Sequence, residues 1–269
     1  MQYKLGFLGA GAMAGAILDN AIDNADTLGI SPDALAVYDI DVAKREFYAK
    51  KGVSIAGTAA ELFKSCEIVL LGVKPQYYAA ILAEVGEYSC KAIASIMAGV
   101  KISTLRKIVG NEMGIIRIMP NMPCRIGEGM SALAFDKTDK DTAAFVTAVF
   151  GACGKTIVIS EDKFDAVTSI SGSGPAYVYL FAAGLIKGGM EGGLTEAEAR
   201  LLALQTLKGA SMLAAADDTA LDTLVDRVCS KGGTTIEAID YYRAADLPGI
   251  IGEGVRRCRE KSKLLSDKL

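Results

Sequence analysis

The sequence contains no histidine. This absence excludes a Ser-His-Asp triad, a histidine metal site and the histidine acid–base chemistry of many dehydrogenases. Any catalytic proton must then come from a hydroxyl group, a lysine, a carboxyl group, a cysteine or water.

Closely spaced cysteines and long apolar runs are also missing. The six cysteines are scattered without a C-x-x-C pair, so neither a disulfide framework nor a thiolate metal site is expected. Scattered core thiols fit a cytoplasmic protein in a reducing compartment. No stretch reaches the roughly 18 to 20 apolar residues that cross a bilayer. The net charge is −3 without a run of like charges, so neither nucleic acid nor a membrane is an expected partner.

The first half of the chain alternates short apolar strands with helices. The continuous apolar run at 68–73 is typical of a strand that is buried on both faces. We expect strands at 5–8, 35–38, 53–56, 68–73, 92–96, 115–119, 130–135 and 156–159. This alternation predicts an α/β fold of the Rossmann type, with a doubly wound, mostly parallel sheet.

After Ser160 the pattern becomes helical to the end. Thr195 and Glu198 form a capping-box pattern that opens one of these helices. The expected helices span 166–171, 176–190, 196–216, 221–229, 236–242 and 250–263. We therefore predict a dinucleotide-binding domain over 1–160 and an all-α domain over 161–269, which together account for the chain.

A glycine turn follows the first expected strand. Gly9, Gly11 and Ala14 fit G-x-G-x-x-A, in which the first glycine makes the turn and the second lets the backbone approach a pyrophosphate. The start at Lys4 resembles a signal peptide faintly, but the glycines interrupt its apolar run. The residues expected to contact a dinucleotide here are Leu8, Gly9, Ala10, Gly11, Ala12 and Met13.

Two further strand ends belong to the same predicted site. Asp39 ends the second strand, where a carboxylate accepts hydrogen bonds from a ribose 2′-hydroxyl and repels a 2′-phosphate. Lys44 or Arg45 could still hold such a phosphate, so both NADH and NADPH remain open. Gly72, Val73, Lys74 and Pro75 end the fourth strand, at the sheet edge where ligands bind in such folds.

Two glycine-containing segments lie in the helical half. The segment 171–177, SGSGPAY, is either a tight turn between helices or a ligand contact. In the segment 230–237, SKGGTTIE, we expect Thr234 to cap a helix with Glu237 as its capping-box partner. Two glycines beside a helix N-terminus also make a cradle that fits a carboxylate. The sequence alone leaves both interpretations of each segment open.

With these segments in place, the chain resembles the pyrroline-5-carboxylate reductases, the family of the last enzyme of proline biosynthesis. The resemblance runs through essentially the whole chain. It is carried by GFLGAGAMA at 6–14, VKP at 73–75, AGV at 98–100, RIMPNMP at 117–123, SGSGPAY at 171–177 and GGTTIEA at 232–238. The last two, behind a Rossmann half, are its most specific signals.

The resemblance implies hydride transfer from NADPH or NADH to the C=N carbon of 1-pyrroline-5-carboxylate, giving L-proline. A protonated imine already attracts hydride, so no strong general acid is needed and the missing histidine is explained. It implies Thr235 and Ser230 as catalytic residues, with Thr235 near the ring nitrogen. It places the substrate carboxylate on Ser230, Gly232, Gly233, Thr234 and Thr235, and adds Met97 and Ala98 to the cofactor site.

The resemblance also implies a homodimer through the C-terminal helices, with the active site shared between subunits, and further assembly into decamers. Two residues depart from the family pattern. Lys231 replaces a proline that commonly precedes the two glycines, and Asp39 stands where many relatives carry residues suited to a 2′-phosphate.

Two other functions compete with the reductase. A β-hydroxyacid dehydrogenase of similar architecture would need a catalytic lysine in the helical half, where Lys187 is the candidate. A catalytically silent relative that senses dinucleotides would need no substrate cradle, so the intact GGTTIE segment argues against it.

Overall fold

The structure is a computed structural model that describes residues 2–86 and 88–268. The chain forms two compact units, each described by itself below. The first contains the described residues up to Ser173 together with those from Cys258 onward, and the second runs from Gly174 to Arg257.

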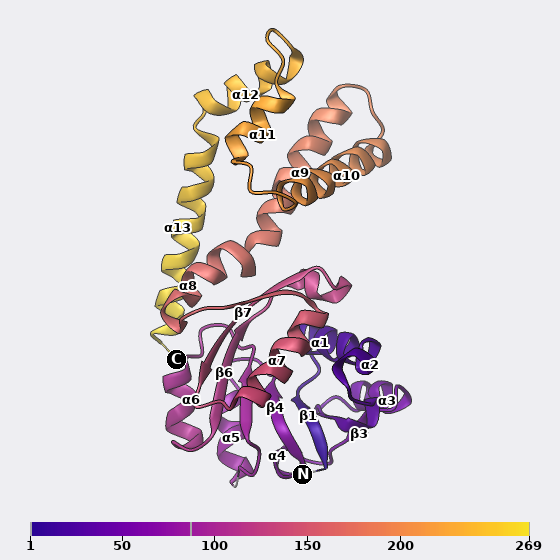
Figure 1. The fold of residues 1–269 in the computed structure, drawn as a ribbon, viewed down its shortest axis with the longest axis vertical. Coiled ribbons are helices and arrows are strands. Elements are labelled where there is room, and N and C mark those ends of the chain that lie inside the picture. The colour runs from indigo at the N-terminus through magenta and orange to yellow at the C-terminus, as the bar shows by residue number, and fades with distance from the viewer. Residues whose placement is uncertain (1, 87, 269) are drawn as a thin grey trace. The chain divides into compact units, whose positions relative to one another are not determined.

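An eight-stranded sheet forms the centre of the first unit (Figure 1). Its strand order is β3-β2-β1-β4-β5-β6-β7-β8, and all neighbours are parallel except the antiparallel pair β6–β7. The strands are β1 (Tyr3–Leu8), β2 (Leu35–Tyr38), β3 (Ser54–Ile55), β4 (Cys66–Leu71), β5 (Ala92–Ser95), β6 (Gly114–Met119), β7 (Gly129–Asp136) and β8 (Gly154–Val158). The predicted doubly wound, mostly parallel sheet is confirmed.

Both faces of this sheet are buried, because successive side chains of each strand point to opposite faces. Phe7 and Leu70 belong to one core and Leu8 and Leu71 to the other. The first core includes residues of α1 (Ala12–Asp23), α3 (Val42–Lys50) and α7 (Lys140–Ala152). The second includes residues of α4 (Ala59–Ser65), α5 (Tyr78–Val85) and α6 (Ile102–Val109). The apolar runs in the sequence are therefore strands covered by helices on both sides.

The sheet reverses its winding direction between β1 and β4. Leu8 pairs in register with Tyr38 of β2 on one side and with Leu71 of β4 on the other. The carboxyl ends of these three strands therefore meet at one edge, which is where α/β sheets bind ligands. The predicted glycine turn, Asp39 and the segment 72–75 all follow these ends.

The first unit extends past the expected boundary near residue 160. The 3₁₀ turn Glu161–Lys163, α8 (Phe164–Val167) and the π-helical turn Thr168–Gly172 follow β8. Phe164 is buried against Ala132 and Ala134 of β7. The end of α13 (Leu247–Ser266) is tied to α8, since the Ser262 hydroxyl donates to the Asp165 carboxylate at 2.7 Å. These contacts hold residues 161–173 against the sheet.

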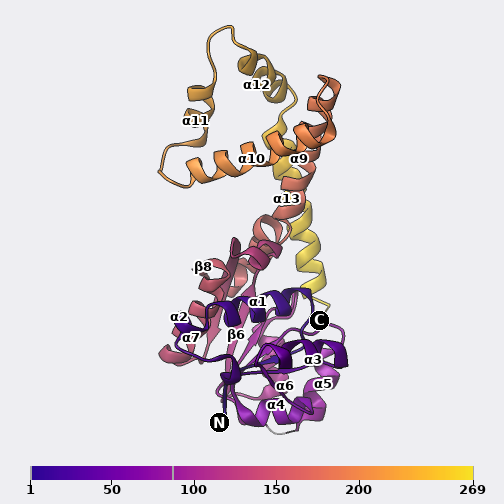
Figure 2. The ribbon, with the colours of Figure 1, turned by 90° about the vertical axis from the view of Figure 1, so that its right-hand side faces the viewer.

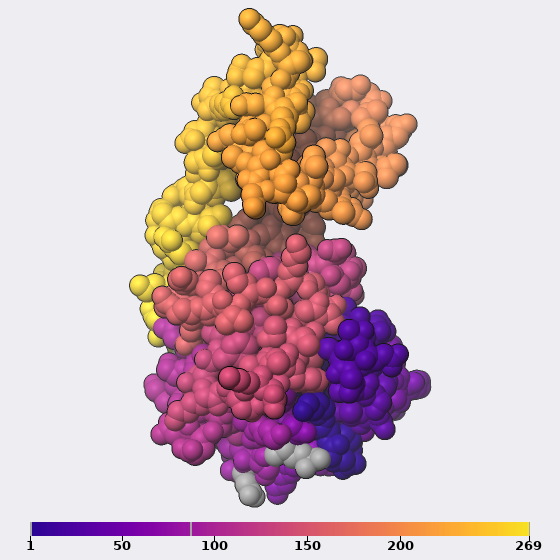
Figure 3. Space-filling view, viewed as in Figure 1, coloured from indigo at the N-terminus to yellow at the C-terminus, as the bar shows by residue number. Residues whose placement is uncertain are grey.

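The second unit is helical (Figure 2), and Figure 3 shows its surface in orange and yellow. Its helices leave most of their apolar side chains exposed. It contains α9 (Gly174–Glu191), α10 (Glu196–Ala214), α11 (Leu221–Val228), α12 (Thr234–Ala244) and the first part of α13. The predicted capping box is confirmed, because the Glu198 amide donates to Thr195 Oγ1 at 3.3 Å and the Thr195 amide to Glu198 Oε2 at 2.8 Å. Among its described residues only Ala182, Ala199 and Ala203 are buried.

Within the described residues, no helix combines the length and the apolar character needed to cross a membrane. All six cysteines are free thiols, and four of them are buried. Burial raises the pKa of Cys66 and of Cys90 to about 12, so both stay protonated and unreactive.

Candidate active site

The glycine turn sits between β1 and α1 as the sequence predicts. Gly9 has φ +89°, a conformation that side chains rarely adopt, and its amide donates to the Tyr38 carbonyl at 2.7 Å. Gly11 is the N-cap of α1 and offers no side-chain cap. The first N–H groups of α1 therefore have no intrahelical partner and can bind an anion.

Gly72 makes the close packing behind this turn possible. A Cβ atom at this position would overlap the Ala14 methyl group and lie 2.9 Å from the Gly9 carbonyl oxygen. A Cβ atom at Gly11 would meet no atom nearer than the Gly72 carbonyl oxygen, at 3.9 Å. The turn is thus tightly packed on its inner side and open at Gly11, which is what a pyrophosphate needs.

Asp39 lies directly against the glycine turn. Its carboxylate accepts hydrogen bonds from the Ala10 amide at 2.7 Å and the Asp41 amide at 2.9 Å, and Lys44 Nζ lies 3.5 Å from its Oδ2. Burial acts to raise the pKa of Asp39, but these amides and the Lys44 charge outweigh it and lower the pKa. The carboxylate therefore stays ionised although its residue is only 8% exposed.

One cavity of about 630 Å³ joins these elements. Of the predicted cofactor residues it is lined by Leu8, Gly9, Gly11, Asp39, Gly72, Val73 and Lys74. A dinucleotide fits this cavity, because its glycine cradle would be filled by any side chain and its helix end is uncapped.

The remaining predicted cofactor residues are not among those that line the cavity. Ala10 contributes its amide to Asp39, Ala12 and Met13 lie in the first turn of α1, and Pro75 follows Lys74. Met97 is buried just after β5, and Ala98 next to it is exposed.

Sequence reasoning missed several residues that line the cavity. Ile40 is 87% exposed and follows the end of β2, and Tyr77 is 57% exposed at the start of α5. Large apolar side chains at the ligand edge of a sheet were a usable signal, since they can cover a base or a nicotinamide ring. The others missed are Tyr38, Asp41, Ala80 and Ile81.

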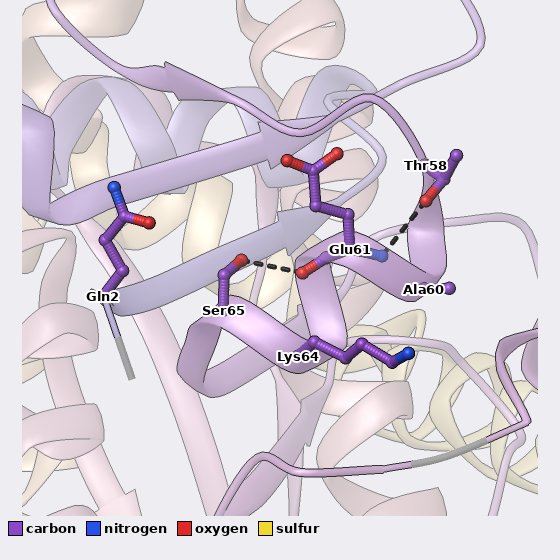
Figure 4. Close-up of a pocket in the computed structure, with 6 residues that line it drawn as sticks. All are labelled: Gln2, Thr58, Ala60, Glu61, Lys64 and Ser65. Carbon is purple, nitrogen blue, oxygen red and sulfur yellow. Dashed lines mark hydrogen bonds between the residues drawn. The ribbon is translucent and has the colours of Figure 1, made fainter.

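A second hollow, of about 750 Å³, is larger but has no comparable chemistry (Figure 4). Three of its polar side chains serve helix α4 itself. Thr58 Oγ1 accepts from the Glu61 amide at the start of the helix, the Glu61 carboxylate accepts from the Gly57 amide, and the Ser65 hydroxyl donates to the Glu61 carbonyl. Gln2 lies beside it at the amino end of β1, opposite the ligand-binding edge. The cavity at the glycine turn is therefore the better candidate for a cofactor site.

The motifs at 117–123 and 171–177 are joined by hydrogen bonds between Asn121 and Ser171. Asn121 Oδ1 accepts from the Met130 amide at 2.9 Å, and its Nδ2 donates to the Ser171 carbonyl and hydroxyl at 3.2 and 3.3 Å. A Cβ atom at Gly172 would overlap the Met119 methyl group. The first glycine of SGSGPAY thus serves a close approach within the π-helical turn, and Pro175 opens α9 as expected.

We expect Asn121→Ala to lower the free energy of unfolding by about 1–3 kcal/mol, because it leaves the Met130 amide without its partner. Chemical denaturation followed by circular dichroism measures this. Asn111→Ala, at an exposed position, is the matched control and should change stability by less than about 0.5 kcal/mol. Equal effects of the two variants would contradict the role of Asn121.

The segment 230–237 leads into α12, and the N-cap of this helix lies one residue earlier than predicted. The N-cap is Gly233, not Thr234, and no side chain caps it, so the predicted capping box with Glu237 is wrong. Glycine can cap a helix through its extended backbone alone, which leaves Thr234 in the first turn. The N-terminus of α12 is therefore free of a side-chain cap, which strengthens its use as an anion cradle.

Ser230 lies against this helix end. The Gly233 amide donates to the Ser230 carbonyl at 2.9 Å, and a Cβ atom at Gly233 would overlap the Ser230 hydroxyl. Gly232 makes the turn with φ +70°. Thr235 is half-buried in the first turn of α12. The predicted substrate residues thus form one loop with a hydroxyl, two glycines and free helix N–H groups.

Lys187 does not sit in a comparable site. Its side chain is 80% exposed, with its Nζ 3.9 Å from Glu191 Oε1 in the same helix.

Two family models match the chain, and known reductases resemble it over its full length. Residues 161–265 match the family model described as "Pyrroline-5-carboxylate reductase dimerisation", and residues 4–99 match "NADP oxidoreductase coenzyme F420-dependent". The chain is 35% identical to a pyrroline-5-carboxylate reductase of Synechocystis over 100% of both chains, and 33% identical to one of Arabidopsis thaliana over 98% of this chain and 96% of that one.

A solved structure supports the same relationship. The pyrroline carboxylate reductase of Plasmodium falciparum, with NADP bound, is 32% identical and superposes with a TM-score of 0.87 over 98% of each chain. Full-length identity above 30%, the shared fold and the matched dimerisation region together identify the family. The chain belongs to the pyrroline-5-carboxylate reductase family.

Proposed function

We propose that this chain is an NAD(P)H-dependent imine reductase that converts 1-pyrroline-5-carboxylate into L-proline, the final step of proline biosynthesis. The observation that carries the proposal is the loop from Ser230 to Thr235, which combines an uncapped helix N-terminus with hydroxyl groups. Full-length similarity to reductases of this name supports the same substrate. A β-hydroxyacid dehydrogenase is disfavoured, because Lys187 is exposed and pairs with Glu191.

The cofactor would be held by the glycine turn, the free N–H groups of α1 and Asp39, with Lys74 nearby. Met97 and Ala98 stay part of this proposed site on the family resemblance. When bound, NADH or NADPH supplies the hydride that reduces the imine carbon. The protein orients both reactants, and this positioning supplies much of the rate.

The substrate carboxylate would bind to the N–H groups that open α12, at Gly233, Thr234 and Thr235, and to the Ser230 hydroxyl. Gly232 and Gly233 leave room for it. The Thr235 hydroxyl oxygen would accept a hydrogen bond from the protonated ring nitrogen, or the hydroxyl would relay a proton there. Because the imine is protonated before it reacts, a hydroxyl group suffices and histidine is not needed.

We further propose that the division of labour follows the expected domains, with the cofactor on 1–160 and dimerisation and substrate binding on 161–269. The family model of the dimerisation region, which begins at residue 161, supports this division. The protein would act in the cytoplasm as a homodimer through its C-terminal helices, with decamers as a further assembly.

The proposed activity is tested by the initial rate of NADH or NADPH oxidation with pyrroline-5-carboxylate, with proline identified as product. Turnover with either cofactor is expected. Tight cofactor binding without turnover would instead identify a silent dinucleotide sensor. Activity on a hydroxyacid but not on the imine would identify the dehydrogenase.

Thr235→Ala should lower kcat by about tenfold or more, because a hydrogen bond to a charged group contributes about 1.5–3 kcal/mol. Steady-state kinetics with saturating cofactor measures this. Thr235→Ser should restore most of the rate, since it keeps the hydroxyl group. Thr27→Ala, an exposed threonine in the first unit, serves as the control and should keep the wild-type rate. A wild-type kcat in Thr235→Ala would remove Thr235 from the proposed mechanism.

A further inference from the structure

The cavity at the glycine turn carries two carboxylates where an adenosine ribose would meet the end of β2. Asp39 and Asp41 both line it, and each accepts a hydrogen bond from a backbone amide. Among the lining cations Lys44 pairs with Asp39, at 3.5 Å, and Arg45 does not line the cavity. This end of the cavity therefore holds two negative charges against one positive charge.

Asp39 cannot easily turn away from an incoming phosphate. Its two oxygen atoms are held by the amides of Ala10 and Asp41, and its side chain is 9% exposed. A carboxylate has about four acceptor positions, so those left over can still accept a ribose hydroxyl. The same fixed charge repels a 2′-phosphate at short range.

Asp41 fills the other place where a phosphate would bind. It is the N-cap of α3, and its Oδ1 accepts from the Ala43 amide at 3.0 Å. A helix N-terminus directly after the second strand is otherwise a ready anion site. Here the protein's own carboxylate occupies it, so a 2′-phosphate would have to displace a charge that is already hydrogen-bonded.

Lys44 does not offset this arrangement. Its Nζ lies 3.5 Å from Asp39 Oδ2, so its charge is already paired with a carboxylate. To bind a 2′-phosphate it would have to leave Asp39, which would then face the phosphate unpaired. Exchanging the Lys44–Asp39 pair for a Lys44–phosphate pair adds little binding energy. The repulsion between the phosphate and the carboxylates of Asp39 and Asp41 remains.

We propose that Asp39 and Asp41 together determine cofactor specificity and make the protein prefer NADH to NADPH. Asp39 accepts a hydrogen bond from the ribose 2′-hydroxyl, and both carboxylates exclude the 2′-phosphate. The inference builds on the proposed function, since it names the reductant of that reaction. It departs from the relative of Plasmodium falciparum, which was solved with NADP bound.

The test is the dissociation constant of NADH and of NADPH, measured by cofactor fluorescence without the imine substrate. The wild type should bind NADH at least about tenfold more tightly, a difference of about 1.4 kcal/mol. Asp39→Asn keeps the shape and removes the charge. Asp41→Ser removes the charge and keeps a hydroxyl that can cap α3. Each variant should lower the preference for NADH severalfold. In the double variant the ratio of the two dissociation constants should be close to one or reversed.

Asp26→Asn, an exposed acid outside this cavity, is the matched control and should leave the preference unchanged. A wild type that binds NADPH as tightly as NADH would overturn the proposal, as would a double variant with the wild-type preference. If Asp39→Asn does not fold, the ratio of the two dissociation constants in the wild type and in Asp41→Ser still tests the proposal. Preferential binding of NADH without imine reduction would refute the proposed function and leave this inference intact.

Discussion

Replacing Leu180 and Leu201 together with glutamate is expected to convert the protein into monomers and to abolish turnover. Leu180 lies on α9 and is 77% exposed, and Leu201 lies on α10 and is 71% exposed. Burying one leucine contributes about 1.5–3 kcal/mol, so a subunit that left this surface in water would forgo a large stabilisation. The homo-oligomer expected of this family supplies the missing apolar partner.

The helices of the second unit are apolar on more than one side. Tyr179, Leu180 and Phe181 are consecutive and all exposed, which places large apolar groups on more than one side of α9. Such helices belong to the interior of an assembly. The substrate loop that ends in Thr235 lies in this same unit, so loss of the partner would leave the loop without support.

Analytical ultracentrifugation with parallel kinetics checks this prediction. NADH binding should persist in the double variant, because the glycine turn and its cavity lie in the first unit. Phe47→Glu, on the exposed side of α3, is the matched control and should stay oligomeric and active. A double variant that keeps both the wild-type mass and the wild-type rate would exclude α9 and α10 from the interface.

Gly11→Ala is expected to weaken cofactor binding without loss of stability, whereas Gly72→Ala is expected to lower stability. The protein atom nearest to a Cβ atom at Gly11 lies 3.9 Å away, and the backbone φ of Gly11, −69°, suits alanine. This variant should fold like the wild type but bind NADH at least about tenfold more weakly, because the methyl group takes the space of the pyrophosphate.

In Gly72→Ala the new methyl group would overlap that of Ala14. The variant should lose about 1–3 kcal/mol of unfolding free energy, because overpacking forces α1 away from β4. Thermal unfolding and cofactor titration of both variants separate the two effects. Loss of stability in Gly11→Ala, or normal stability in Gly72→Ala, would contradict the packing described for the turn.

Patterns of side chains were sufficient to predict the sheet and most helices. The run at 68–73 predicted a strand buried on both faces, and β4 runs from Cys66 to Leu71 between two cores. The glycine turn, Asp39 and Gly72 were predicted to share a site because parallel strands end at one edge. Periodicity and turn chemistry are local properties, so they can be recognised without the fold.

The N-cap of α12 was predicted one residue late, at Thr234, because the sequence offers two acceptable caps. Thr234 with Glu237 fits a capping box, yet the chain uses Gly233. Which residue caps a helix depends on the backbone that precedes it, here the turn at Gly232 with φ +70°. Local patterns do not specify that path.

The sequence by itself determined the strand–helix alternation, the glycine cradle and the family to which the chain belongs, because each is written in short segments. Only the tertiary structure decided how the Asp39 carboxylate is held, and that the Asp41 carboxylate caps α3. It also decided which of the many apolar side chains in the helical half stay uncovered. These outcomes depend on distances between residues that are remote in the chain, such as Ala10 and Asp39, and burial and hydrogen bonding are set by that proximity.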